Sequence, residues 1–232
     1  MKKVDLNVDI GEGFEFDAQL LDFATSANVC CGEHAGSWEL TIATVHLCRS
    51  KGVRIGAHPG FPDRESMGRR TPTFERFLDY LPNLQMQMMR FRIEFGAPDY
   101  VKPHGAWYNM LCSPDDEGRV QISVGILEAE AVASRCAVML LPSSPFISRL
   151  RSRGVNVLSE GFADRAYSKT GGLLSRTEPK AVLTDESEIR SQVLTLAPGV
   201  DSICLHGDTP GCWEIAKLVR STLEEAGYEV RY

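Results

Sequence analysis

Four of the five histidines in this chain follow short apolar runs and stand next to glycine or proline. They are His34 in GEHAG, His58 in GAHPG, His104 in KPHG and His206 in LHGD. In a β/α barrel the carboxyl ends of all strands converge on one face, where the loops build the active site. We therefore expect these four imidazoles to share one cleft. The fifth, His46, falls inside an expected helix and is interpreted as an ordinary helix residue.

Acidic and amide side chains of the first expected strand add to the same cleft. In VDLNVDI, residues 4–10, alternate side chains share a face, which places Asp5, Asn7 and Asp9 together. We expect this polar face to line the mouth of the barrel. A solvent-exposed face of an antiparallel strand is the alternative explanation. The GEG that follows lacks the third glycine of a dinucleotide-binding loop, and the sequence has no Walker-type phosphate loop.

The same alternation recurs at two later strand ends. Lys102 and His104 share a face in 101–104, and so do Cys204, His206 and Asp208 in 202–208. A single histidine at a strand end is more often a hydrogen-bonded structural residue than a catalyst. Four of them beside acidic residues favour a reactive site. We therefore predict catalytic roles for Asp9, His58, His104, His206 and Asp208.

Composition excludes several classes of function. The 232 residues carry 25 Lys and Arg against 31 Asp and Glu, a formal charge of -6, which argues against nucleic-acid binding. The sequence shows neither a signal-peptide pattern nor an apolar run of membrane-spanning length, so a cytoplasmic protein without membrane contact is expected. Its seven cysteines form no C-x-x-C pair and are interpreted as reduced and buried.

Apolar runs alternate with helical patterns along the whole chain. We expect strands at 3–8, 24–29, 54–57, 100–102, 137–141, 156–158, 181–183 and 202–205, and helices at 39–50, 75–94, 115–134, 145–153, 186–196 and 213–226. Ser37 and Thr73 stand where N-caps are expected, and 113–116 also has the composition of a helix start. Such alternation predicts one α/β domain, residues 1–232, built around a parallel sheet.

Six sequence blocks, in order along the chain, resemble the LamB/YcsF family. They are DLNVDIGEG at 5–13, SANVCCGEHAG at 26–36, GAHPGFPD with GRR at 56–63 and 68–70, VKPHGAWYN at 101–109, EGFADRAY at 160–167 and HGDTP at 206–210. The resemblance implies an irregular seven-stranded β/α barrel of the glycoside hydrolase/deacetylase type. It also implies a hydrolase that opens the cyclic amide of 5-oxo-L-proline to L-glutamate at the expense of ATP, with two further 5-oxoprolinase subunits. The chain departs from the family pattern at Val8, Glu33, 37–38 and 64–67.

Opening an unactivated lactam at neutral pH needs an activated carbonyl, a general base and cations for anionic groups. Phosphorylation of the carbonyl oxygen by ATP would supply the activation. We expect the base among His58, His104 and His206, with Asp9 or Asp208 orienting an imidazole. The remaining candidates are expected to bind substrate, and they are Asn7, Asn28, His34, Arg69, Arg70, Lys102, Glu160, Asp164 and Arg165.

Several alternatives remain open at this level. Arg69 and Arg70 also fit a solvated surface pair, and Asp164 with Arg165 also fits a salt bridge. Asp9, His58 and His104 could instead ligate a divalent metal in a deacetylase-like amidohydrolase. A third alternative is a non-catalytic subunit that only binds substrate, and the sequence leaves open whether ATP binds here or on a partner and whether the chain forms a homo-oligomer.

Overall fold

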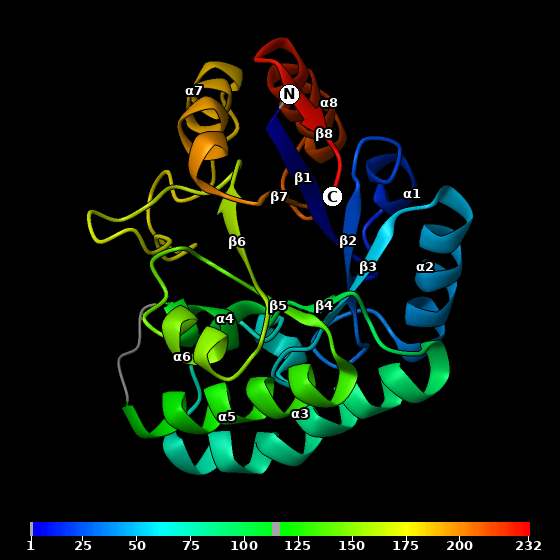
Figure 1. The fold of residues 1–232 in the computed structure, drawn as a ribbon, viewed down its shortest axis with the longest axis vertical. Helices are drawn as coiled ribbons and strands as arrows, with labels where there is room; N and C mark the ends of the chain where they lie inside the picture. Colours follow the sequence, from blue (N-terminus) through cyan, green and yellow to red (C-terminus); the bar gives the residue numbers. More distant parts are fainter. Residues whose placement is uncertain (1, 113–116) are drawn as a thin grey trace.

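Seven parallel strands close into a barrel in the computed structural model, which describes residues 2–112 and 117–232 (Figure 1). The barrel strands are β1 (Lys2–Ile10), β2 (Ser26–Cys30), β3 (Arg54–His58), β4 (Tyr100–Val101), β5 (Ala137–Leu140), β6 (Val157–Phe162) and β7 (Ser202–His206). They follow one another in chain order, and β1 closes the ring by pairing with both β2 and β7. An eighth strand, β8 (Tyr228–Val230), adds to the start of β1.

The register of β1 with its two neighbours determines which residues lie beside Asp9 near the carboxyl end of the barrel. Asp9 lies beside Asn28 of β2 on one side and beside His206 of β7 on the other. Because every named strand pairs in parallel, all carboxyl ends lie at the same edge of the barrel. The parallel sheet is therefore confirmed, and the alternative of an antiparallel β1 with a solvent-exposed polar face is wrong.

Helices lie between the strands and cover the barrel. The longer ones are α2 (Trp38–Lys51), α3 (Phe74–Phe95), α5 (Glu117–Ser134), α7 (Glu186–Leu196) and α8 (Cys212–Glu225), and the shorter ones are α1 (Asp17–Leu20), α4 (Gly105–Cys112) and α6 (Ile147–Ser152), with 3-10 turns η1 (Arg64–Ser66) and η2 (Ala197–Gly199). The hydroxyls of Ser37 and Thr73 accept from the amides of Leu40 and Arg76, so both expected N-caps are confirmed. Figure 1 shows α3 and α5 packed side by side along the lower edge.

Three expectations about elements need correction or comment. The predicted strand at 181–183 is wrong, because Val182 forms only an isolated antiparallel bridge with Arg165. Its neighbour Ala181 is buried, so this apolar run packs as a loop. The elements β8, α1 and α4 were not predicted, because three or four residues are too few for a periodic signal and α4 begins at a glycine. The helix start expected at 113–116 lies outside the described residues.

The two faces of β1 serve different parts of the molecule. Val4, Leu6, Val8 and Ile10 belong to the main apolar core, whereas Asp5, Asn7 and Asp9 are buried in the barrel interior. Asp5 accepts hydrogen bonds from Ser26 of β2 and Ser202 of β7, the two strands on either side of β1. The inside of this barrel is therefore a polar network, and its upper layer forms the floor of the site.

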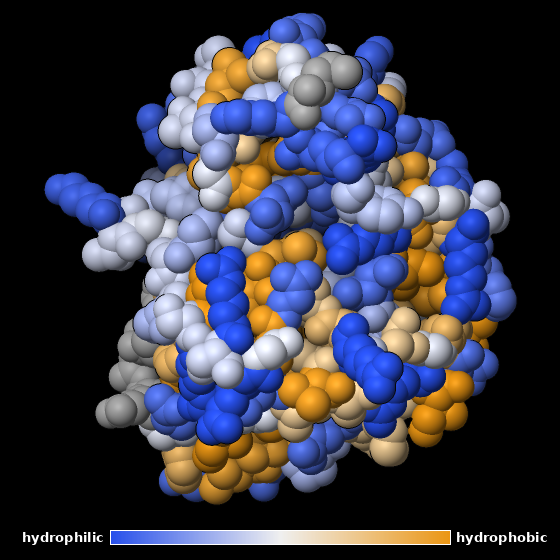
Figure 2. Space-filling model, in the orientation of Figure 1, coloured by the Kyte–Doolittle hydropathy of each residue, from blue (hydrophilic) through white to orange (hydrophobic). Residues whose placement is uncertain are grey.

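Apolar side chains also reach the outer surface along the lower edge in Figure 2, where α3 and α5 lie. The exposed ones on these helices are Phe74, Leu78, Met86, Met89, Ile93 and Val132. All seven cysteines are free thiols and buried, as expected. Within residues 2–112 and 117–232, none of the helices has the length and apolar character that crossing a bilayer requires.

Candidate active site

A cleft of about 480 Å³ opens at the carboxyl ends of the strands. Its lining includes Asp9, His58, Lys102, His104 and His206, together with Arg69, Arg165 and Arg176. His58 and His206 are the last residues of β3 and β7, and His104 follows β4 directly. The parallel barrel thus brings three of the four sequence-predicted histidines into one cleft, and His34 lies behind them, in ring contact with His58 and His104.

Asp9 is the centre of the polar network on the cleft floor. Its Oδ1 accepts from Nδ2 of Asn28 at 2.6 Å and from Nζ of Lys102 at 3.0 Å. Its Oδ2 lies 3.4 Å from Nε2 of His58 and 3.7 Å from Nε2 of His206. Burial acts to raise the pKa of Asp9, but the charge of Lys102 holds it well below its usual value. Asp9 is therefore a fixed anion at neutral pH, suited to orienting its neighbours.

Lys102 is the cation that balances this anion. Its ammonium also lies 3.0 Å from Oε2 of Glu160 and 2.9 Å from the sulfur of Cys204. Burial acts to lower the pKa of Lys102, but the charges of Asp9 and Glu160 and the contact with the sulfur of Cys204 raise it well above its usual value. The side chain is fully buried, so its charge acts on the cleft from below.

His206 is held by a carboxylate in the manner of a general base. Its Nδ1 lies 2.9 Å from Oδ1 of Asp164, and Oδ2 of Asp164 accepts from the hydroxyl of Thr209 and the amide of His206. Burial acts to raise the pKa of Asp164, but His206 and these hydrogen bonds lower it to about 2. An ionised Asp164 fixes the proton of His206 on Nδ1 and leaves the lone pair of Nε2 facing the cleft. The orienting role was expected of Asp9 or Asp208; in the structure Asp164 holds His206, and Asp9 lies 3.4 Å from Nε2 of His58.

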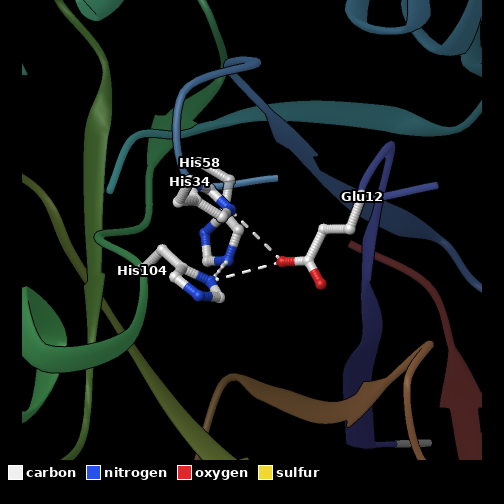
Figure 3. A group of neighbouring side chains, drawn as sticks. All are labelled: Glu12, His34, His58 and His104. Carbon is white, nitrogen blue, oxygen red and sulfur yellow. Dashed lines mark hydrogen bonds and ion pairs between the residues drawn. The ribbon is translucent and has the colours of Figure 1, made fainter. Parts of the chain in front are cut away.

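A second group gathers Glu12 with three histidines beside this pair (Figure 3). Oε1 of Glu12 lies 3.3 Å from Nε2 of His34 and 3.3 Å from Nδ1 of His104. Burial acts to lower the pKa of His34, but Cys30 and Glu12 raise it to about 10. Burial and the charge of His34 hold the pKa of His104 well below its usual value. The cluster therefore offers a neutral His104 and a carboxylate at the same point.

Three arginines form the cationic wall of the cleft. Asp208 accepts from Arg69 at 2.6 Å and from both terminal nitrogens of Arg176 at 3.0 and 3.1 Å. Arg165 donates to the backbone oxygens of Ala181 and Leu174. Burial and the charge of Arg176 lower the pKa of Arg165 to about 10. One carboxylate between three guanidinium groups leaves positive charge for an anionic ligand.

The remaining predicted residues lie below or outside the cleft. Asn7 and Asn28 are buried and bonded to each other at 2.6 Å, and Glu160 is buried beside Lys102. These three support the floor of the cleft and do not line it. Arg70 is exposed and pairs with Glu65, as its alternative interpretation as a surface residue expects.

Two residues of the site, Glu12 and Arg176, were not predicted from the sequence. Glu12 follows the turn at Gly11, where the two-residue period of β1 no longer applies, although its place after a strand end was a usable signal. Arg176 lies in the long segment between β6 and α7, which carries no periodic pattern. The residues with metal-ligand geometry are Glu12, His34, His58 and His104, whose ligand atoms all lie within 4.8 Å of one another. The metal set expected from sequence shares only His58 and His104 with this group.

Comparisons with known proteins place the chain in a family. A model of the LamB/YcsF family matches residues 4–232. A Pyrococcus furiosus protein named as a 5-oxoprolinase subunit is 38% identical, and the match covers 98% of this chain and 96% of that protein. The chain belongs to the LamB/YcsF family. The crystal structure of a lactam utilization protein from Thermus thermophilus matches this LamB/YcsF chain with a TM-score of 0.77 at 30% identity, over 99% of each chain.

The barrel itself is shared more widely than the sequence. A fungal endo-beta-N-acetylglucosaminidase of glycosyl hydrolase family 18 matches with a TM-score of 0.52 at 10% identity, over 95% of this chain and 98% of that chain. At this identity the likeness concerns the fold alone. The irregular seven-stranded β/α barrel of the glycoside hydrolase type is therefore confirmed for this LamB/YcsF protein.

Proposed function

We propose that this LamB/YcsF protein is the ring-opening component of an ATP-dependent 5-oxoprolinase, which cleaves the cyclic amide C–N bond of 5-oxo-L-proline to give L-glutamate. The names of the 38% identical relative and of the lactam utilization protein support this activity. The observation that carries it is the placement of His206, held at Nδ1 by Asp164 and facing the cleft with Nε2. A fixed imidazole beside a cationic wall is what hydrolysis of an activated, anionic amide requires.

His206 acts as the general base in this mechanism. The lactam carbonyl is activated by phosphorylation of its oxygen at the expense of ATP, and water attacks the carbonyl carbon. Nε2 of His206 takes the proton from this water, because Asp164 keeps the other nitrogen protonated. The resulting imidazolium returns the proton to the ring nitrogen as the C–N bond breaks, which leaves the phosphoryl group on the new carboxyl as γ-glutamyl phosphate. A second water hydrolyses this acyl phosphate to L-glutamate and inorganic phosphate. Asp9, at 3.7 Å from Nε2, stabilises the imidazolium.

The arginine wall orients the substrate. Arg69, Arg165 and Arg176 line the same cleft as His206. Guanidinium groups bind carboxylates and phosphates through paired hydrogen bonds. We assign to them the α-carboxylate of 5-oxoproline and the phosphoryl group of its activated form.

ATP and partner chains belong to this proposal. The sequence has no Walker-type phosphate loop, so we assign ATP binding to a partner subunit. The name of the relative marks it as one subunit of a larger enzyme, and we propose that two further 5-oxoprolinase subunits complete the complex. Since ATP is the co-substrate, we place this complex in the cytoplasm.

Reconstitution tests the proposal directly. The chain is co-purified with the products of its neighbouring genes, and ATP-dependent release of glutamate from 5-oxoproline is measured with and without it. We expect turnover from the complete mixture and little or none from the isolated chain. Full activity of the partner subunits without this chain would contradict the proposal, and robust turnover by the isolated chain would contradict the assignment of ATP to a partner.

A further inference from the structure

Two imidazole lone pairs face each other in the group formed by Glu12, His34, His58 and His104. Nδ1 of His58 lies 2.7 Å from the carbonyl oxygen of Lys102, and Nε2 of His104 lies 2.8 Å from the carbonyl oxygen of Met67. A carbonyl only accepts, so both nitrogens must carry their protons. In the neutral rings this leaves lone pairs on Nε2 of His58 and Nδ1 of His104, which lie 2.9 Å apart.

The surroundings of these two lone pairs are also acceptors. Among the described residues, Oε1 of Glu12 lies 3.3 Å from Nδ1 of His104, and Oδ2 of Asp9 lies 3.4 Å from Nε2 of His58. The ammonium of Lys102 binds the other oxygen of Asp9. Buried acceptors that face one another are unfavourable unless a proton or a cation lies between them.

We propose that Glu12, His58 and His104 bind one divalent transition-metal cation of the zinc type. Zinc bound to nitrogen and oxygen at about 2.0–2.2 Å requires tetrahedral ligand atoms about 3.3–3.6 Å apart. The three ligand atoms include pairs at 2.9 and 3.3 Å, so small side-chain shifts suffice. In Figure 3 the Glu12 carboxylate points at the histidines from the opposite side, which leaves the ion site between them.

The surrounding backbone supports this site in the way that metal ligands are supported. Each ligand histidine donates its distal N–H to a backbone carbonyl, the usual arrangement that orients an imidazole toward a metal. Met67 offers its carbonyl to His104 from a left-handed conformation with φ of 52°, which costs energy for a residue other than glycine. Met67 is also the residue that ends η1, so the fold of this turn fixes the carbonyl that orients His104.

His34 is a positioning residue in this arrangement. Its ring stacks on that of His104, with centroids 3.8 Å apart and an interplanar angle of 7°. An imidazole lone pair lies in the plane of its ring, so one ion cannot lie in the planes of two stacked rings. Nε2 of His34 lies 3.3 Å from Oε1 of Glu12, which fits a hydrogen bond that orients the carboxylate.

The chemical type of the ligand atoms, and the opening of the site to the cleft, indicate which class of ion binds. Two imidazoles and one carboxylate suit zinc and neighbouring transition metals, whereas magnesium and calcium prefer sites made of oxygen atoms. His58 and His104 both line the cleft, so an ion can enter and keep an open coordination position. A catalytic role for the ion, which would polarise a bound oxygen, rests on the proposed function, but the binding itself does not.

Metal binding to the isolated full chain tests the inference. The protein is stripped with a chelator, dialysed and titrated with zinc, and zinc content is then measured by elemental analysis and affinity by calorimetry. We expect about one equivalent per chain, and about a 100-fold or greater loss of affinity in Glu12→Gln and in His104→Gln. His34→Gln should lose about 10–100-fold, as expected for a residue that orients a ligand. Cobalt provides a second readout, because its visible absorption reports nitrogen and oxygen ligation.

The controls separate folding and function from binding. His46→Ala, on the exposed face of α2, should bind zinc like the wild type. Zinc should raise the thermal midpoint of the wild type but not that of Glu12→Gln, and circular dichroism verifies that each variant is folded. If Glu12→Gln does not fold, Glu12→Asp, which keeps the charge but shortens the side chain, replaces it.

The inference is overturned if the stripped wild type takes up no zinc, or if zinc binds equally well without Glu12 and His104. Glutamate release by the reconstituted enzyme is scored separately, so a failure of the proposed function is distinguishable.

Discussion

Asp164 and His206 form a carboxylate–imidazole pair, 2.9 Å from Oδ1 to Nδ1, across the carboxyl ends of neighbouring strands β6 and β7. The pair has the geometry by which a buried acid fixes the tautomer of a catalytic histidine. It also explains why His206 is suited to act as the base, although Asp9 lies near the same ring.

Replacement of Asp164 by Asn should therefore abolish most of the turnover. The Asn amide can donate to Nδ1, which would move the imidazole proton to Nε2 and remove the base from the cleft. We expect a loss of about 10²–10⁴-fold in glutamate release by the reconstituted enzyme. Asp185→Asn is the matched control, because Asp185 is an exposed N-cap of α7 and Asn caps a helix equally well. Unchanged turnover in Asp164→Asn would show that His206 is not the base.

Asp9 and His104 give a second prediction about turnover. Asp9 connects Lys102, His58 and His206, and His104 links the same network to Glu12. Asp9→Asn and His104→Ala should each cost the reconstituted enzyme about 10²–10⁴-fold in turnover. His46→Ala should cost almost nothing. Near-normal turnover in both variants, with folding verified by circular dichroism, would favour a subunit that only binds substrate.

The residues that strands contribute to the site were predictable, because side chains alternate along a strand and the carboxyl ends of parallel strands meet at one edge. The two-residue period of β1 places Asp9 opposite Leu6 and Val8, and parallel pairing then fixes its neighbour in β7 as His206. The first rule needs only the sequence, whereas the register of β1 with β7 comes from the closed barrel. The predicted cleft therefore contains Asp9, His58, Lys102, His104 and His206.

The residues that loops contribute to the site could not be predicted from strand periodicity. Glu12 follows Gly11, whose φ of 77° turns the chain out of the strand period. Gly36 packs so closely that a Cβ there would lie 2.2 Å from the carbonyl oxygen of Gly11, so contacts distant in sequence fix this loop. The position of the Arg176 side chain is likewise fixed by its ion pair with Asp208, a residue from another loop. Hydrogen bonds between loops, rather than periodicity, decide where such side chains point.

Arg176 offers a test of the anion-binding wall. Asp208 holds its guanidinium through two hydrogen bonds, and the side chain lines the cleft. Arg176→Gln should raise KM for 5-oxoproline by about 10–100-fold, the equivalent of one lost charged hydrogen bond or two, with a smaller change in kcat. The matched control is Arg70→Gln, because Arg70 is an exposed arginine outside the cleft. Equal KM values in the two variants would contradict an anion site at Arg176.

Asp17 gives a prediction about stability and pH that is independent of turnover. Burial raises the pKa of Asp17 to about 6, despite the hydrogen bond that it accepts from the amide of Gly11. The folded state therefore holds a proton that the unfolded chain releases near pH 4. As pH rises from about 4 to about 6, this group's contribution to the free energy of unfolding must fall, and the loss is complete about one pH unit above the folded pKa.

The variant Asp17→Asn isolates this contribution, because its amide oxygen can keep the hydrogen bond from Gly11 and it does not ionise. Denaturant unfolding of both proteins is measured at pH 4, 5, 6 and 7. The difference in stability between variant and wild type should shift by about 1–2 kcal/mol in favour of the variant between pH 4 and pH 6, and then change little. A difference that is independent of pH would show that Asp17 ionises in the folded protein as readily as in the unfolded chain.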